Sequence, residues 1–157
     1  MSGTRIENAI ETLNAQIGQP SDPTDWFEIT QERVNTFADA TLDQQWIHVD
    51  PERAKEGPFG APIAHGQLTL SIMSFLPGGA GVGLPSLDGM KLGINYGWNK
   101  VRFMNPVQVG AKIRTVGKLL SVEEKTGMLE VINEMTVEIE GADKPACVAQ
   151  SVLRIVF

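Results

Sequence analysis

The sequence predicts an α+β fold in which one antiparallel sheet wraps around a single buried helix. Residues 92–157 alternate apolar and polar side chains over several long stretches, which is typical of half-buried antiparallel strands. Ahead of them, the segment GQLTLSIMSFL at residues 66–76 is apolar on nearly every side, which favours a helix without a solvent-exposed face. Helices and loops first, a long buried helix next and a meander of four strands last together describe the hot-dog fold.

The strand pattern occurs four times in the second half of the chain. The predicted strands span residues 92–103, 112–123, 129–139 and 147–157. In the first of them the apolar parity shifts between Trp98 and Val101, which predicts a β-bulge. Pro77 is expected to end the buried helix, and the tract PGGAGVGLPSLDG that begins there is expected to be a loop.

The first half of the chain is predicted to hold helices and loops. Thr4 and Glu7 have the spacing of a capping box, so a helix is expected to begin there and to end at Gly18. The two prolines in residues 19–25 indicate a linker. We therefore expect residues 1–25 to form an N-terminal helix and linker, and residues 1–157 to form a single domain.

The pattern between this linker and the buried helix predicts three further elements. Residues 26–29 are a candidate for a short strand, and Thr30 can cap a second helix that runs out near Thr41. Asp50 followed by Pro51 is a suitable N-cap and first residue for a short helical turn. Residues 43–48, between the two helices, are expected to be irregular.

Composition excludes several classes of function. The 157 residues include 13 basic and 19 acidic side chains, and the net charge of −6 argues against a nucleic-acid-binding protein. Cys147 is the one cysteine, so no intramolecular disulfide can form, and its apolar neighbours indicate a buried thiol. No apolar run is long enough to span a bilayer, and the first residues lack the apolar core of a secretory signal. A cytoplasmic location is the expectation.

Both histidines of the chain lie in one region, which makes that region the candidate site. Asp43 precedes His48 by five residues, and Trp46 and Ile47 between them provide apolar surroundings. A carboxylate and an imidazole in such a place can share one water, with histidine as the general base and aspartate as hydrogen-bond acceptor or acid. The alternative is that Asp43 belongs to the end of a helix and that His48 is a structural histidine.

His65 and Gly66 stand at the start of the predicted buried helix. The first amides of a helix have no intrahelical acceptor, so the N–H of Gly66 can stabilise a developing oxyanion. The alternative for Gly66 is that glycine relieves crowding where the helix meets the sheet, and the alternative for His65 is a structural role. Two histidines seventeen residues apart without a cysteine partner are poor zinc ligands, so no metal is expected.

Polar residues on the first predicted strand form a weaker candidate for ligand binding. Tyr96, Asn99 and Arg102 lie there among glycines, and they could line a groove for a phosphorylated carrier. The alternative is the ordinary polarity of a strand at the edge of a sheet.

These residues together resemble a known family. Asp43, the five-residue step to His48 and the later Ala64-His65-Gly66 resemble the MaoC-like dehydratases, which include the R-specific enoyl-CoA hydratases, or hydratase 2. The stretches FADATLDQQWIHVDPERAKEGPFGAPIAHGQLTLSI and NYGWNKVRFMNPVQVGAKIR are similar to the subgroup of nodulation-protein-N-like hydratases. The resemblance covers roughly residues 28–157. One departure is that Gln45 and Trp46 replace the Asn-Pro of the usual Asp-x-Asn-Pro-x-His pattern, which leaves the preferred acyl length open.

The resemblance implies a hot-dog homodimer with the two sheets joined edge to edge. It implies reversible hydration of a trans-2-enoyl-CoA to the (3R)-3-hydroxyacyl-CoA, with Asp43 and His48 activating the water and the amide of Gly66 stabilising the thioester enolate. Trp46, His65, Tyr96, Asn99 and Arg102 are then candidates for substrate binding. No metal or redox cofactor is implied, since coenzyme A is part of the substrate.

Two other functions fit the same fold. A hot-dog acyl-CoA thioesterase would need a carboxylate near the start of the buried helix, and residues 66–76 contain none. A non-catalytic subunit that binds acyl thioesters would keep the pocket and depend on a partner chain for turnover.

Overall fold

The computed structural model describes residues 2–79 and 86–157. Its elements follow one another along the chain as α1 (Ser2–Asn14), β1 (Phe27–Glu28), α2 (Gln31–Thr41), α3 (Trp46–Val49), α4 (Pro51–Lys55), α5 (Gly66–Ile72), β2 (Leu92–Phe103), β3 (Lys112–Lys125), β4 (Met128–Ile139) and β5 (Cys147–Val156). The glycine-rich tract predicted as a loop lies partly outside the described residues, because residues 80–85 are not among them.

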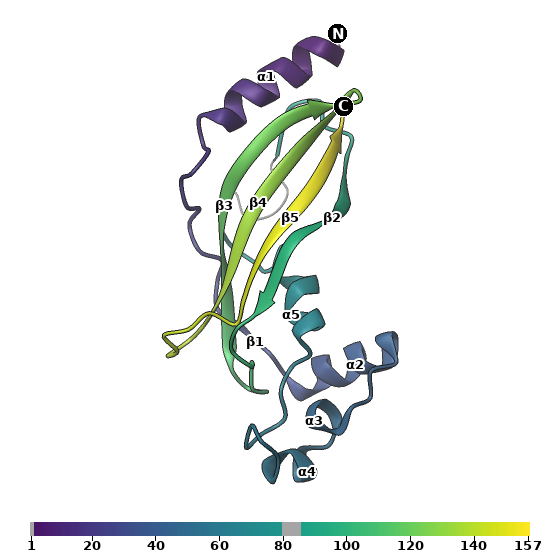
Figure 1. The fold of residues 1–157 in the computed structure, drawn as a ribbon, viewed down its shortest axis with the longest axis vertical. Helices are drawn as coiled ribbons and strands as arrows, with labels where there is room; N and C mark the ends of the chain where they lie inside the picture. The colour runs from purple at the N-terminus through teal and green to yellow at the C-terminus, as the bar shows by residue number, and fades with distance from the viewer. Residues whose placement is uncertain (1, 80–85) are drawn as a thin grey trace.

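The strands form one antiparallel sheet in the order β1-β3-β4-β5-β2, which curls around α5 (Figure 1). The four long strands match the predicted ranges to within two residues at each end. The register between β2 and β5 shifts at Trp98/Lys100, so the predicted bulge is confirmed. Two further shifts, at Asn95/Gly97 and Leu119/Ser121, were not predicted.

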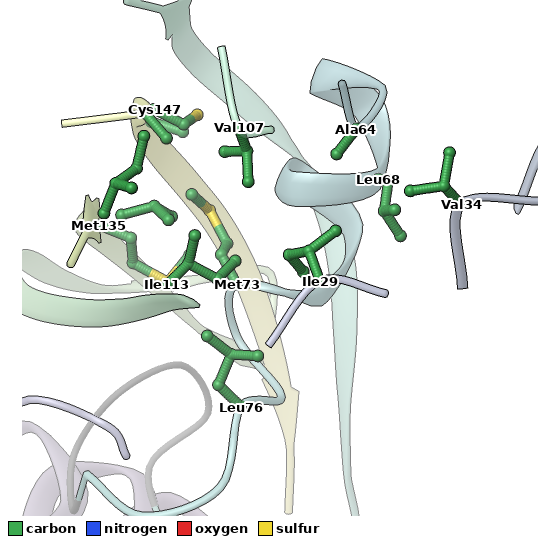
Figure 2. Close-up of a cluster of buried hydrophobic side chains, with 14 residues drawn as sticks. Ile29, Val34, Ala64, Leu68, Met73, Leu76, Val107, Ile113, Met135 and Cys147 are labelled. Carbon is green, nitrogen blue, oxygen red and sulfur yellow. The ribbon is translucent and has the colours of Figure 1, made fainter. Parts of the chain in front are cut away.

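The inner face of the sheet carries two apolar clusters. The first lies between the sheet and α5, where Met73 and Leu68 contact side chains from the strands and from α2 (Figure 2). Met73, Ile113 and Met135 in this cluster are fully buried, and Cys147 is buried as predicted. The second cluster lies at the other end of the sheet, where α1 places Ile6, Ala9 and Leu13 on β3, β4 and β5.

The three short helices α2, α3 and α4 gather at the end of the molecule opposite α1 (Figure 1). The predicted cap of α2 is confirmed, because the hydroxyl of Thr30 accepts a hydrogen bond from the N–H of Arg33. Asp50 and Pro51 begin α4 as predicted, with the Asp50 carboxylate accepting from the N–H of Arg53. Among the described helices, none combines the length and apolarity needed to cross a bilayer.

Three predictions about the helices are wrong. α1 begins at Ser2, so Thr4 lies within the helix and cannot cap it, and α1 ends at Asn14, four residues before Gly18. Residues 46–49 are helical where an irregular stretch was expected. α5 ends at Ile72 instead of residue 76, and it is not buried on all sides. Gln67, Ser71 and Phe75 recur every fourth residue on its exposed side, and Phe75 is 76% exposed, because no described element covers that side.

Candidate active site

The site is built where α2, α3 and the start of α5 meet. Asp43 follows the end of α2, His48 lies on α3, and His65 is the N-cap residue of α5. One nitrogen of each imidazole and one carboxylate oxygen of Asp43 all lie within 4.8 Å of one another. The fold thus brings together Asp43, His48 and His65, the three residues that were predicted from their types and spacing.

A backbone contact fixes which nitrogen of His48 is basic. Its Nδ1 lies 2.7 Å from the carbonyl oxygen of Ile63. A carbonyl can only accept a hydrogen bond, so Nδ1 carries the proton and Nε2 of the neutral ring keeps its lone pair. Burial lowers the pKa of His48 below its usual 6.5; the Ile63 contact opposes this, the neighbouring His65 lowers the pKa further, and Asp43 raises it. The imidazole is therefore held in the form of a base.

Asp43 lies on the solvent side of this group. It is exposed, and its Oδ1 accepts from the N–H of Gln45 at 3.4 Å, a long contact. Within the described part of the chain, no direct hydrogen bond joins the Asp43 carboxylate to either imidazole. One water can bridge a carboxylate oxygen and an imidazole nitrogen across a separation of this size, because two hydrogen bonds in series span roughly 5–6 Å.

His65 is the inner member of the group and is only 2% exposed. Its ring stacks on that of His48 with 3.8 Å between the centroids and 24° between the planes, and Phe37 lies on it at 5.0 Å. Asp, His and His are donor types that bind transition metals. The two rings lie in nearly parallel planes, however, with 3.8 Å between their centroids, so in-plane lone pairs on the two rings do not converge on a common metal ion.

The start of α5 lines a pocket of about 270 Å³. Ile63, Ala64 and Gly66 form one wall, and Phe59, Phe103 and Val107 are among the residues opposite. The ring of Phe103 lies so close to Gly66 that a Cβ at this position would be 2.9 Å from its Cγ. Crowding at Gly66, one of the two explanations offered for this glycine, is therefore present in the structure.

A larger cavity, of about 520 Å³, lies on the other side of α5, between that helix and α2. Phe37, Leu68 and Ile72 give it apolar walls, and Arg33 and Glu32 line its outer part. Asp43, His48 and His65 are not among the residues that line either cavity. Phe37, which lines the larger one, contacts His65, and Ile63, which lines the smaller one, bonds His48.

Among the described residues, no hydrogen bond or ring contact joins the remaining predicted site residues to Asp43, His48 or His65. Trp46 is half-buried beneath the Arg53 guanidinium, which lies 4.4 Å from its ring, and the ring also lies close to Gly57. Tyr96 is 65% exposed on β2 and is covered by Arg154. Tyr96 is seven residues, or roughly 23 Å along the strand, from Phe103, which is the residue of β2 that lies against Gly66. Asn99 and Arg102 are exposed on the same edge strand. Within one chain, the side chains of Tyr96, Asn99 and Arg102 therefore make no described contact with Asp43, His48 or His65.

Three contributors to the site were not foreseen. The carbonyl of Ile63 holds His48, Phe37 packs on His65, and the side-chain amide of Gln31 donates to the His48 carbonyl at 2.8 Å. The first and third are backbone contacts between residues 15 and 17 positions apart, for which a sequence carries no signal. Phe37 lies on the predicted second helix, and its contact with a histidine 28 positions later is likewise set by the tertiary fold.

Comparison with known proteins places this geometry in a family. The MaoC like domain matches residues 12–140. The chain is 48% identical to the 3-hydroxyacyl-thioester dehydratase Z of Mycobacterium tuberculosis (strain ATCC 25618 / H37Rv) over 97% of its own length and 99% of that protein. It is 40% identical to nodulation protein N of Rhizobium leguminosarum bv. viciae, over 96% of this chain and 93% of that one.

Solved structures agree on the fold. The MaoC-like dehydratase of Rhodospirillum rubrum superposes with a TM-score of 0.69 at 20% identity, over 90% of this chain and 92% of that chain. The predicted hot-dog fold is confirmed. On the match over most of its length, the chain belongs to the MaoC-like dehydratase family.

Proposed function

We propose that this protein catalyses the reversible addition of water to a trans-2-enoyl thioester, giving the (3R)-3-hydroxyacyl thioester. The observation that carries the proposal is the fixed base. Nδ1–H of His48 is bound to the Ile63 carbonyl, so Nε2 keeps its lone pair, and a nitrogen of this ring lies within 4.8 Å of an Asp43 carboxylate oxygen. The relative that is 48% identical is named for dehydration of 3-hydroxyacyl thioesters, which is the same reaction in reverse.

The chemistry needs a positioned water, a proton for the α-carbon and a donor to the thioester oxygen. In the proposed mechanism, Asp43 and His48 hold the water, and His48 takes one proton as the water oxygen bonds to C3. The electrons of the double bond move toward the carbonyl, and the N–H of Gly66, the first residue of α5, stabilises the enolate. The proton taken by His48 is then delivered to C2, with the Asp43 carboxylate relaying it, which completes the addition and returns both groups to their starting forms.

The family resemblance points to coenzyme A as the carrier in the substrate, and we propose no metal or redox cofactor. Trp46, Tyr96, Asn99 and Arg102 stay candidates for substrate contacts, the last three because they share an exposed edge strand. His65 is buried behind His48, and we assign it a different role below.

Crotonyl-CoA tests the activity directly. Purified protein should remove the conjugated-enoyl absorbance without releasing free thiol, and an (S)-specific 3-hydroxyacyl-CoA dehydrogenase should not oxidise the product. Release of thiol would instead identify a thioesterase. Binding without any turnover would identify the non-catalytic subunit, and oxidation by the (S)-specific enzyme would reverse the proposed stereochemistry.

Two substitutions test the roles of the pair. Asp43→Asn and His48→Gln should each lower kcat by at least about 100-fold while the circular dichroism spectrum stays unchanged, because general acid–base groups typically contribute 10²–10⁴-fold. Asp50→Asn is the matched control: it removes a nearby exposed carboxylate charge and keeps a residue that caps α4 well. Full activity in both site variants would place the chemistry elsewhere.

We also propose that the functional form is a homodimer joined through β2. This strand is at one edge of the sheet, and five of its large apolar or aromatic side chains are exposed: Leu92, Ile94, Tyr96, Trp98 and Phe103. An edge strand of this kind is a ready template for pairing with a second copy.

A further inference from the structure

A hydrogen bond from His65 ties the segment that carries Asp43 to the start of α5. Nε2 of His65 lies 3.0 Å from the main-chain oxygen of Asp43, 22 residues earlier in the chain. The carbonyl can only accept, so Nε2 carries the proton and donates. Nδ1 of His65 is buried and has no hydrogen-bond partner in the described residues, so a proton there would have no acceptor. The geometry therefore selects the Nε2–H tautomer.

The backbone around Asp43 needs a hydrogen bond of this kind to hold its conformation. Leu42, directly before Asp43, has φ +66° and ψ +11°, the left-handed conformation that disfavours residues other than glycine. Its side chain is 85% exposed, so packing of this side chain does little to hold the conformation. The Asp43 carboxylate makes only the long contact with Gln45, and Gln44 bonds back to Asp39 on α2. Among the hydrogen bonds of residues 42–45 within the described chain, the one from His65 is the connection to α5.

The same ring also sets the position of His48. The His48 imidazole stacks on His65 with 3.8 Å between the ring centroids. The Nδ1–H of His48, at the edge of the ring, donates to the carbonyl of Ile63. Phe37 contacts His65 and limits its movement. One side chain thus touches both members of the pair, Asp43 through its backbone and His48 through its ring.

We infer that His65 is the positioning residue of this site: its Nε2–H and its ring together fix the separation between the Asp43 carboxylate and the His48 imidazole, without touching the substrate. The expected effect of His65 on kcat rests on the proposed function. Its expected effect on the position of the Asp43 segment rests on geometry alone. A misplacement of about 1 Å in a catalytic group can cost roughly 100-fold in rate.

Two variants separate the hydrogen bond from the stack. His65→Gln keeps a side-chain N–H that can reach the Asp43 carbonyl, whereas His65→Phe keeps the stacked ring and removes the donor. We expect His65→Phe to lower kcat about 100-fold with KM changed less than about threefold, and His65→Gln to recover at least about tenfold of that loss. Equal kcat values for His65→Phe and wild type, or a larger loss in His65→Gln than in His65→Phe, would overturn the inference.

Hydrogen exchange supplies a readout that does not depend on turnover. The amides of residues 42–46 should exchange faster in His65→Phe than in wild type and should be largely restored in His65→Gln. Thr41→Ala is the matched control, because it removes the bond from Thr41 Oγ1 to the Phe37 carbonyl at the same end of α2 and leaves the His65 contact in place. Unchanged exchange in His65→Phe would also refute the role of the hydrogen bond, even if the wild-type protein proved inactive on crotonyl-CoA and the proposed function failed.

Discussion

At the scale of single residues, the contact between His48 and the Ile63 carbonyl decides what chemistry the site can perform. An imidazole that was free to rotate could present either nitrogen, and either tautomer, to the water. The bond to Ile63 removes that choice and leaves Nε2 as the acceptor. Burial strengthens the effect, because it disfavours the charged ring and so keeps the base available near neutral pH.

The lowered pKa of His48 predicts the pH dependence of hydration. The base must be unprotonated, so the acidic limb of kcat/KM should be centred below pH 6.5, at the lowered pKa. Asp43 and the Ile63 carbonyl raise the pKa but do not reverse this direction, because burial is the largest influence on His48. A pH–rate profile for crotonyl-CoA measures it. An acidic limb centred above pH 6.5 would mean that His48 is not the base or is more hydrated than its burial indicates.

The sequence could predict the pair but not its surroundings. Asp43 and His48 stand five positions apart on the chain, and the short span limits how far they can separate. The contact of His48 with Ile63 and that of His65 with Asp43 join residues 15 and 22 positions apart. Both depend on the path of residues 56–65, whose backbone conformation follows from tertiary packing and not from a local pattern.

At the scale of elements, prediction succeeded where a local signal governs the outcome. Thr30 and Asp50 cap helices because their side-chain oxygens reach the free N–H groups three residues on, a purely local interaction. The strands were foreseen because alternation is visible in each of them separately. The predicted length of α5 is too great because the apolar pattern continues to residue 76, beyond the end of the helix at Ile72. The same pattern also predicts burial for Phe75, which is exposed, because burial depends on what other elements cover.

The contact between Phe103 and Gly66 predicts a coupled effect on stability. In Gly66→Ala the new Cβ would lie 2.9 Å from Cγ of Phe103, so we expect the free energy of unfolding to fall by about 1–3 kcal/mol, the usual cost of overpacking. Phe103→Ala, which lacks Cγ and both Cδ atoms, should remove most of this penalty in the double variant. Urea unfolding of the four proteins forms a double-mutant cycle, and costs that simply add would show that the two residues are not in contact in solution.

At the scale of the whole molecule, the sheet covers α5 from one side only. The opposite side of α5 presents Phe75, and the edge strand β2 presents a row of large apolar side chains, so one chain leaves substantial apolar surface uncovered. The sequence pattern did not distinguish these positions from the core. Residues buried against a second chain and residues buried in the core of their own chain are both apolar, so the two kinds of position give the same sequence pattern.

The homodimer proposal predicts that charge on β2 will separate the subunits. Ile94 and Trp98 are 43% and 38% exposed on this edge strand, and burying a carboxylate between two copies would be costly because it would lose its hydration without gaining a partner. Ile94→Glu and Trp98→Glu should therefore halve the mass measured by light scattering on a sizing column, with the circular dichroism spectrum retained. Lys112→Glu, an exposed change on β3, is the control and should leave the mass unchanged. A monomeric wild-type protein, or dimers that persist in both variants, would mean that the exposed face of β2 serves something other than self-association, and the partner would then have to be sought among other chains.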